Sequence, residues 1–326
     1  NGSWNTMKLS IVTTLYQSAA YIQEFYQRAT NVAQELVEDD YEIIFVNDGS
    51  PDNSLEIAIS LCEIDSHIKL IDLSRNFGHH KAMMTGLSHS IGDHTFLIDS
   101  DLEEEPEWLI SFSEELNKGT CDVVYGVQKK RKGNLFERWS GQVFYKGFNA
   151  ITGLELPHNM ITARLMSRRY VNALLKHKER EIFIAGLWLI TGFVQKPQII
   201  RKHSTSNTTY TLGSKLSLLV NAITSFSNKP LIGIFYLGVI ISIIAGSYTA
   251  FLLVNKLFLS TALSGWTSVM VSIWFLSGLL ISSVGVVGIY LSKMFSEIKQ
   301  RPNTIVRKLY GDITNDDLNN RHENPD

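Results

Sequence analysis

Short apolar runs alternate with amphipathic stretches over the first 127 residues of the chain. The apolar runs predict β-strands at Lys8–Leu15, Tyr41–Val46, Ile68–Leu73, His94–Ile98 and Cys121–Val127. Between them apolar residues recur at helical spacing, which predicts helices at Ala19–Val37, Asp52–Ile64, His80–Ser90 and Pro106–Leu116. Strands that alternate with helices predict an α/β fold with a mostly parallel, Rossmann-like sheet covered on both faces.

Two long runs without charge distinguish the C-terminal third. Leu231–Val254 and Trp266–Ser292 contain no charged residue, and each exceeds the ~20 residues that a helix needs to cross the hydrocarbon core of a bilayer. Cations flank the two runs, and the connection between them carries Lys256 alone. Because cytoplasmic flanks are richer in Lys and Arg, we predict a transmembrane hairpin with both flanks in the cytoplasm. The alternative, a pair of buried core helices, fits two such long runs poorly.

Two further stretches near these runs have apolar residues at helical spacing. Leu135–Ile151 and Leu212–Phe226 each combine an apolar face with polar positions. Each either lies in the membrane interface or packs on the sheet. The second leads directly into the first charge-free run, which favours the interface for residues 206–230, whereas the first stays open. After Gly311 the chain is polar, and we predict that it is disordered.

The overall composition argues against several classes of protein. With 326 residues and a formal net charge of −2, the chain has room for one sizeable domain beside the hairpin and lacks the basic excess that indicates a nucleic-acid partner. Cys62 and Cys121 are too few and too isolated for a disulfide framework or a zinc site. They fit buried thiols in a reducing compartment.

Polar residues follow three successive strands of the predicted sheet. Asp48 follows the second strand, Arg75 and Asn76 follow the third, and Asp99-Ser100-Asp101 ends the fourth. Open α/β sheets bind ligands at the carboxyl ends of their strands. Asp99 and Asp101 share a face of the strand, and two carboxylates suit Mg²⁺ or Mn²⁺ carrying a diphosphate. Each loop alone also fits a solvated or capped turn, but their coincidence favours a nucleotide-diphosphate site.

The order of these motifs resembles glycosyltransferase family 2 with the GT-A fold. The resemblance extends from Met7 to about Val306, through Asn47–Ser50, Arg75–His80, Asp99–Leu102, Val124–Val127, Arg164–Met166, Thr209–Leu212, Ser225–Ser227 and Gly288–Leu291. The chain is similar in particular to the polyprenyl-phosphate glycosyltransferases, the bactoprenol and dolichol-phosphate enzymes with two C-terminal transmembrane helices. This resemblance implies an inverting transfer of sugar from a nucleotide sugar, such as a UDP-hexose, to undecaprenyl or another polyprenyl phosphate. It also implies Mg²⁺ or Mn²⁺ as cofactor and a role in O-antigen or lipopolysaccharide modification.

The same resemblance implies roles for individual residues. Asp48 would hold the base or ribose, Asp101 would ligate the metal, and Asp99 would lie beside it near the ribose or diphosphate. Other positions in the nucleotide-sugar site would be Thr14, Leu15, Tyr16, Arg75, Asn76 and Ser100. The family usually has Pro-Val-Tyr-Asn-Glu in the first loop, and Thr14, Gln17 and Ser18 depart from this pattern.

Asn159 and Thr162 depart further, because relatives often carry acids there, one of which has been proposed as a base. A phosphate monoester has a second pKa near ~6 and needs little deprotonation at neutral pH, so we still predict an enzyme. We predict instead that these two residues orient the donor sugar. Cations predicted to bind the acceptor phosphate are Lys129, Arg131, Arg164 and Lys215. The two arginines are favoured because their planar fork matches phosphate, and they are candidates for catalysis with Asp99 and Asp101.

Glu103 and the pair His79 and His80 each allow a functional and a structural interpretation. Glu103 either reaches the sugar or metal or is solvated alongside Glu104 and Glu105, and we favour the solvated state. His79 and His80 either contact the nucleotide or simply cap and pack at a helix start, and the second is favoured.

Together these inferences predict a cytoplasmic GT-A catalytic domain at 7–205, a juxtamembrane amphipathic helix at 206–230, two transmembrane helices within 231–292 and a cytoplasmic tail at 293–326. The expected location is the bacterial inner membrane, as a multi-pass protein. Expected partners are a nucleotide sugar, polyprenyl phosphate, membrane lipid and further copies of the chain, with a tetramer implied by resemblance. The alternatives are a glycosyltransferase with another lipid-linked acceptor and a non-catalytic nucleotide-sugar-binding scaffold.

Overall fold

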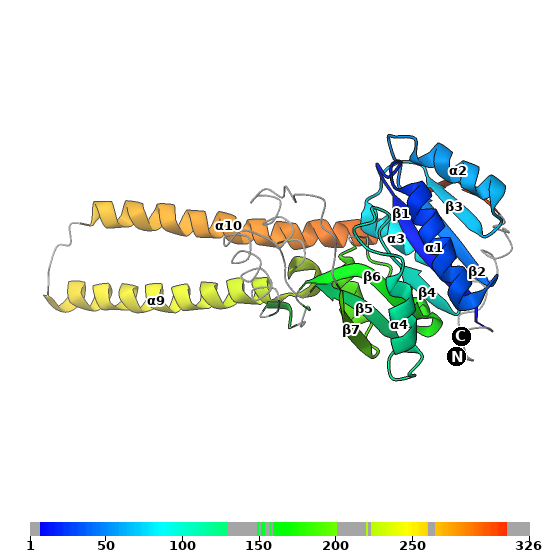
Figure 1. Ribbon diagram of the computed structural model, residues 1–326. Helices are drawn as coiled ribbons and strands as arrows, with labels where there is room; N and C mark the ends of the chain where they lie inside the picture. Colours follow the sequence, from blue (N-terminus) through cyan, green and yellow to red (C-terminus); the bar gives the residue numbers. More distant parts are fainter. Residues whose placement is uncertain are drawn as a thin grey trace. The chain divides into compact units, whose positions relative to one another are not determined.

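The computed structural model describes residues 7–128, 149, 151–153, 157, 159–180, 182–200, 220, 223–259 and 265–311. The chain forms two compact units (Figure 1). The sheet unit comprises Asn1–Tyr145, Glu155–Thr209 and Arg301–Asp326, and the helical unit comprises Lys146–Leu154 and Tyr210–Gln300. The sheet unit is therefore assembled from chain segments on both sides of the helical unit.

Within the described residues, the sheet unit holds an eight-stranded sheet in the order β7-β5-β6-β4-β1-β2-β3-β8. The strands are β1 (Leu9–Leu15), β2 (Tyr41–Asn47), β3 (Ile68–Leu73), β4 (His94–Leu97), β5 (Val123–Gln128), β6 (Met160–Ser167), β7 (Gln195–Ile200) and β8 (Val306–Tyr310). Strands β4, β1, β2 and β3 are mutually parallel, whereas β6 runs antiparallel between β4 and β5. The predicted α/β fold with a mostly parallel sheet is confirmed.

Helices cover both faces of this sheet. They are α1 (Ile22–Val37), α2 (Ser54–Ile64), α3 (His79–His89), α4 (Trp108–Leu116), α6 (Arg168–Leu174) and α7 (Ile184–Ile190). Phe25 of α1 packs edge-on against Phe45 of β2, with ring centroids 6.1 Å apart. Gly86 of α3 lies against Val12 and Val46, which alternate with Phe45 along the strands and face the other way. The α1 and α3 helices therefore seal opposite faces.

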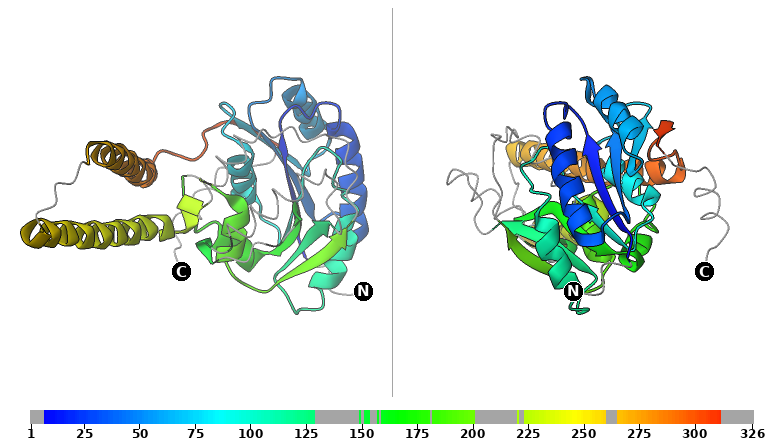
Figure 2. Two further views of the ribbon diagram at one scale, coloured as in Figure 1. Left: turned by 90° about the vertical axis from the view of Figure 1, so that its left-hand side faces the viewer. Right: turned by 45° about the vertical axis from the view of Figure 1, so that its right-hand side comes forward.

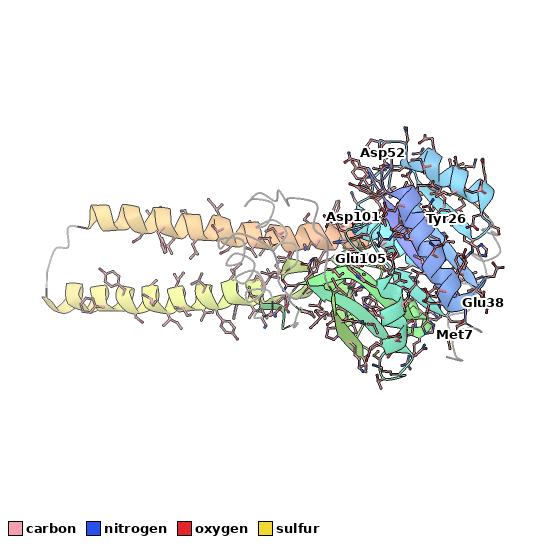
Figure 3. The ribbon with its side chains drawn as sticks, viewed as in Figure 1. Met7, Tyr26, Glu38, Asp52, Asp101 and Glu105 are labelled. Atoms are coloured by element: carbon pink, nitrogen blue, oxygen red, sulfur yellow. The ribbon has the colours of Figure 1, made fainter. Side chains whose placement is uncertain are left out.

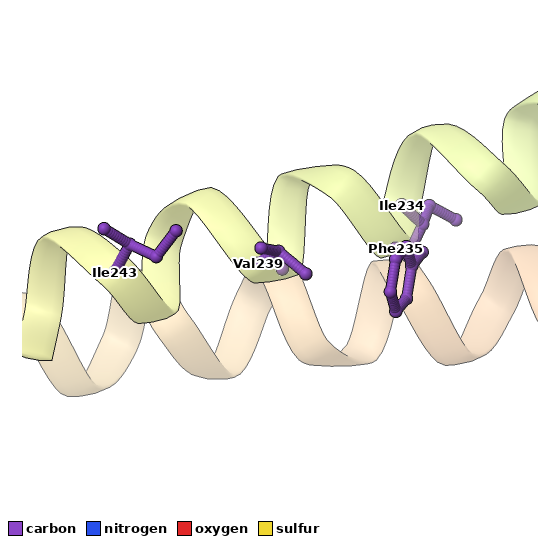
Figure 4. A pocket seen from close by; sticks show the side chains of 5 residues that line it. Ile234, Phe235, Val239 and Ile243 are labelled. Atoms are coloured by element: carbon purple, nitrogen blue, oxygen red, sulfur yellow. The ribbon is translucent and has the colours of Figure 1, made fainter.

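The helical unit contains two long helices, α9 (Lys229–Leu259) and α10 (Trp266–Ile298), which contact each other (Figure 1). Figure 4 shows an apolar pocket on α9 lined by Ile234, Phe235, Gly238, Val239 and Ile243. The Tyr290 hydroxyl of α10 donates to the carbonyl of Ser227, just before α9, at 2.6 Å. Of the described residues, Phe275–Ile298 are long and apolar enough to cross a membrane, and Lys229–Ala245 form a shorter apolar stretch. One of the two predicted spans thus meets this criterion, and the other stays a prediction.

The sequence prediction and the structure agree closely in the first 127 residues. Every predicted strand and helix there is present, with ends shifted by at most three residues. The elements from β6 to β7 and the strand β8 were not predicted. Strand β8 lies antiparallel beside β3, so the predicted tail at 293–326 begins with the end of α10 and then an edge strand of the sheet (Figure 2). Most of Leu135–Ile151 and Leu212–Phe226, and the chain after Gly311, lie outside the described residues.

Candidate active site

The candidate site lies where the chain order of the sheet reverses. Strands β2 and β3 follow β1 on one side, whereas β4 lies on its other side. Ligands of open α/β sheets bind at the carboxyl ends of the strands beside such a reversal. In Figure 3, Asp52 and Asp101 lie at this end of the parallel strands, and Met7 and Glu38 lie at the opposite end. The loops after β1, β2, β3 and β4 therefore share one edge, as predicted.

Asp48, after β2, connects two of these loops. Its carboxylate accepts hydrogen bonds from the Phe77 amide at 2.7 Å and the Gly78 amide at 3.0 Å, in the loop between β3 and α3. Burial raises the pKa of Asp48, and the two amides oppose that rise. A Cβ on Gly49 would lie 2.5 Å from the Asn76 nitrogen, so the close approach of the loops requires glycine there. Asp48 braces the loop in this structure, and its contact with a base or ribose stays a prediction.

His79, the first residue of α3, connects β1 with the end of β4. Its Nδ1 lies 2.9 Å from the Thr14 hydroxyl, and its Nε2 lies 3.2 Å from Asp99 Oδ1. Burial works to lower the pKa of His79, but the hydrogen bond and charge of Asp99 outweigh it and the pKa rises. The Ser100 hydroxyl donates to the Thr14 carbonyl at 2.9 Å, which adds a second tie. His79 is thus a strut between two strand ends, a role that the favoured interpretation of this residue as a packed cap missed.

Asp101 is the exposed carboxylate of the pair. Its Oδ1 accepts the Glu103 amide at 3.0 Å, and the intervening Leu102 has a positive φ of 59°. The tight turn directs Asp101 to the surface while His79 engages Asp99. The described residues contain no group of three or more His, Cys, Asp or Glu side chains that could hold a metal ion. Two carboxylates are nevertheless a donor set that fits Mg²⁺ or Mn²⁺ when phosphate oxygens supply further ligands.

Two loops of the site expose side chains. Tyr16 is 48% exposed after β1, and the next amide, of Gln17, donates to the Ser50 hydroxyl at 2.7 Å. Arg75 and Asn76 are exposed after β3, and the Arg75 guanidinium lies 4.1 Å from the centre of the Phe77 ring. Leu15 itself is fully buried, so the predicted role of this position reduces to its backbone. A flat aromatic ring, a cation and an amide are thus available to a ligand at this edge.

Arg164 and Glu104 occupy the interior, contrary to expectation. Arg164 of β6 has no exposed surface, donates to the Thr162 and Ile161 carbonyls and packs over the Trp188 ring. Burial lowers the pKa of Arg164 to about 9. Glu104 is 1% exposed and accepts the Thr162 amide at 3.2 Å, so it is not solvated beside Glu103. An enclosed guanidinium offers an acceptor phosphate no surface, and this structure gives that predicted role of Arg164 no support.

The remaining predicted residues fall into two groups. Asn159 has a positive φ of 61°, and its side-chain amide lies 3.4 Å from the Gln128 carbonyl, while Thr162 is held through its amide by Glu104. Both lie at the start of β6, and their predicted contacts with a sugar stay predictions. Lys129, Arg131 and Lys215 lie outside the described residues.

Comparisons with known proteins show the family of the chain. Residues 10–175 match the model described as glycosyl transferase family 2. The chain is 50% identical over 309 residues to a Mycobacterium tuberculosis (strain CDC 1551 / Oshkosh) protein named among the glycosyltransferases, covering 94% of this chain and 90% of the relative. It is 31% identical over 305 residues to the SfII prophage-derived bactoprenol glucosyl transferase of Shigella flexneri, covering 93% and 98%. A solved structure, S. aureus TarS 1–349 in complex with UDP-GlcNAc, has 17% identity and a TM-score of 0.44 and covers 67% of this chain and 66% of that one.

Proposed function

The chain belongs to glycosyltransferase family 2, and from this premise we propose that it transfers a hexose from a UDP-sugar to a polyprenyl phosphate, with inversion at the anomeric carbon. The observation that carries the proposal is the match to the bactoprenol glucosyl transferase of Shigella flexneri. That match covers 93% of this chain and so extends beyond the family domain into the helical unit. A lipid acceptor is confined to the membrane, and an enzyme that uses one needs both parts.

In this proposal the loops of the sheet edge bind the donor. Tyr16 offers its ring to the base, Asp48 and the loop it braces lie by the ribose, and Arg75 and Asn76 offer donors to the diphosphate. Asp101 and Asp99 would hold a Mg²⁺ or Mn²⁺ ion. When bound, such an ion would neutralise charge on the diphosphate.

The acceptor carries its own nucleophile. A phosphate oxygen of the polyprenyl phosphate attacks the anomeric carbon as the bond from that carbon to the diphosphate oxygen breaks, and UDP departs with the bonding electrons. A phosphate monoester is largely dianionic at pH 7, so no protein base is required. This chemistry is compatible with Asn159 and Thr162 where relatives often carry acids. The chain would contribute chiefly by positioning the reactants and by charge complementarity, for which Lys129, Arg131 and Lys215 are candidates.

A turnover assay in detergent tests this proposal. The purified chain would receive undecaprenyl phosphate, Mg²⁺ or Mn²⁺ and a panel of nucleotide sugars, and mass spectrometry would detect the lipid products. We expect a polyprenyl monophosphate sugar from one donor, and a loss of at least about 100-fold in kcat for Asp101→Asn. Glu105→Gln, on the same loop, is the matched control and should stay within about twofold.

Other outcomes would redirect the proposal. Transfer to a different lipid-linked acceptor would keep the enzyme class and replace the acceptor. Nucleotide binding without product from any acceptor would indicate a scaffold. Full activity of Asp101→Asn with metal present would remove Asp101 from the metal site.

A further inference from the structure

The chain returns to the sheet unit after α10. This return segment, residues 301–311, contacts elements that support the candidate site. In β8, Leu309 pairs with Ile71 and Lys308 with Asp72. The Ser74 amide then donates to the Ile305 carbonyl at 2.9 Å, and the Thr304 hydroxyl lies 2.8 Å from that of Thr85 on α3. The return segment therefore lies against β3, the loop that follows it and α3.

Arg307 of the return segment contacts the end of β3. Its Nη2 donates to the Ser74 carbonyl at 2.9 Å and the Leu73 carbonyl at 3.4 Å, where β3 leads into its loop. Its Nε lies 3.6 Å from Oδ2 of Asp72, whose side chain is 2% exposed. Arg307 thus fixes two backbone carbonyls and lies beside a buried carboxylate.

The buried Asp72 carries this contact into the neighbouring strand. Its Oδ1 accepts the Asn47 side-chain amide at 2.8 Å, and Asn47 Oδ1 accepts the Ser50 amide at 3.2 Å. Asn47 precedes Asp48, which binds the amides of Phe77 and Gly78. Arg307 therefore contacts the start of the loop after β3 directly, through the Leu73 and Ser74 carbonyls. It is linked to the loop after β2 through Asp72 and Asn47.

We propose that Arg307 is a positioning residue for nucleotide binding, so that the chain beyond the helical hairpin completes the donor site. This inference rests on the proposed function, because it presumes that these loops bind a nucleotide. The Arg307 side chain is 55% exposed, whereas Asp72 is buried, so removing Arg307 would leave the Asp72 carboxylate beside Asn47 without this cation at its solvent side. The strand end would relax to rehydrate that charge, and the loops after β2 and β3 would lose their shared geometry. Arg307 does not need to touch the ligand for this effect.

Nucleotide affinity of the full chain in detergent measures this role. Titration calorimetry with UDP, GDP, ADP and TDP first identifies the nucleoside diphosphate that the wild type binds. For that ligand, we expect Arg307→Met to raise Kd about tenfold and Arg307→Lys to raise it less, because Lys keeps the charge and loses the fork. Lys308→Met is the matched control, since Lys308 is exposed on the same strand over the Tyr310 ring, and it should stay within about twofold. The double variant Arg307→Met with Asp72→Asn, which removes the buried charge as well, should recover part of the affinity.

The outcomes separate this inference from the proposed function. A wild type that binds no nucleoside diphosphate would refute the proposed donor site and the inference with it. A wild type that binds, together with an Arg307→Met chain of unchanged Kd, would overturn the positioning role alone. If Arg307→Met does not fold, Arg307→Lys and the double variant make the same comparison. A raised KM for the donor with unchanged kcat at saturation would support positioning, whereas an equal loss of melting temperature in Arg307→Met and Lys308→Met would indicate a merely structural effect.

Discussion

Asp52 shows, at the residue scale, how one side chain organises a loop of the candidate site. Its carboxylate accepts the Ser50 hydroxyl at 2.5 Å, the Ser54 hydroxyl at 2.5 Å and the Ala19 amide at 3.1 Å. Burial works to raise the pKa of Asp52, but these hydrogen bonds outweigh it and lower the pKa to about 2. Because Ser50 in turn accepts the Gln17 amide, Asp52 holds the loop that presents Tyr16.

We predict that Asp52→Asn lowers the free energy of unfolding by about 1–3 kcal/mol at pH 7, because charged hydrogen bonds are lost. The pKa is lower in the folded chain than its ordinary value near 3.8, so the stabilisation is present above that value and is lost as pH falls toward 2. Urea denaturation in mild detergent at pH 7 and pH 3 checks both signs. The difference in the free energy of unfolding between wild type and variant should be smaller at pH 3 than at pH 7. Glu56→Gln, an exposed acid in the first turn of α2, should show no such gap, and a gap that widens at low pH would contradict the assignment.

Local pattern predicts some of the site residues and not others. Asp99 and Asp101 were placed correctly at the sheet edge because a strand end and a two-residue alternation are local features. The burial of Arg164 and Glu104 was not predicted, because it depends on β6 lying between β4 and β5 and on Trp188 packing over the guanidinium. Those are long-range contacts, which a single sequence does not display.

Helix α3 shows, at the element scale, how close packing positions the site. It begins at His79, the strut to Thr14 and Asp99, and two turns later Gly86 lies directly on the sheet. A Cβ at Gly86 would lie 2.5 Å from Val12 Cγ1 and 2.9 Å from Val46 Cγ2. The distance from α3 to the sheet therefore depends on the missing side chain, and the position of His79 depends on that distance.

We predict that Gly86→Ala lowers the free energy of unfolding by about 1–3 kcal/mol, because two branched side chains must move to admit the methyl group. Helix propensity alone would give the opposite sign, a gain of about 1 kcal/mol, so the sign decides between the two effects. Chemical denaturation in detergent measures it. Adding Val12→Ala should make the double variant less destabilised than the sum of the two single changes. A stabilised Gly86→Ala would show that α3 is free to lift from the sheet.

Strands with a continuous apolar pattern were predicted from the sequence, and strands rich in polar residues were not. Strands β1 to β5 are buried, apolar runs, and periodicity finds such runs readily. Strand β7 contains Pro197 between polar residues, and β8 contains adjacent Arg307 and Lys308, so neither displays an apolar pattern. Both lie at the edges of the sheet, where polar and charged residues are common because one side of the strand is unpaired.

The position of β8 constrains the topology of the whole molecule. Strand β3 precedes the helical hairpin in the chain, β8 follows it, and the two pair in one sheet. Two strands of one sheet lie on the same side of a membrane. The chain between β7, which is in the same sheet, and β8 must therefore cross an even number of times. If α10 crosses the bilayer, a second segment between Ile200 and Trp266 crosses too, and α9 is the long apolar helix described in that stretch. The pairing of β3 with β8 therefore supports the proposed pair of spans independently of the length and hydropathy of each helix.

Cysteine labelling in intact bacterial cells tests the two-span topology. In a chain with Cys62→Ser and Cys121→Ser, we predict that Ser260→Cys, between the two helices, reacts with a membrane-impermeant maleimide from outside, because the cation-rich flanks favour the cytoplasm. Asn303→Cys, in the return segment, should react only after the membrane is permeabilised. Labelling of neither position in intact cells would place the hairpin in the cytoplasmic interface, with zero crossings. If the sheet unit is cytoplasmic, labelling of position 303 from outside would place β8 and β3 on opposite sides of the membrane. That result would contradict the pairing of β3 with β8.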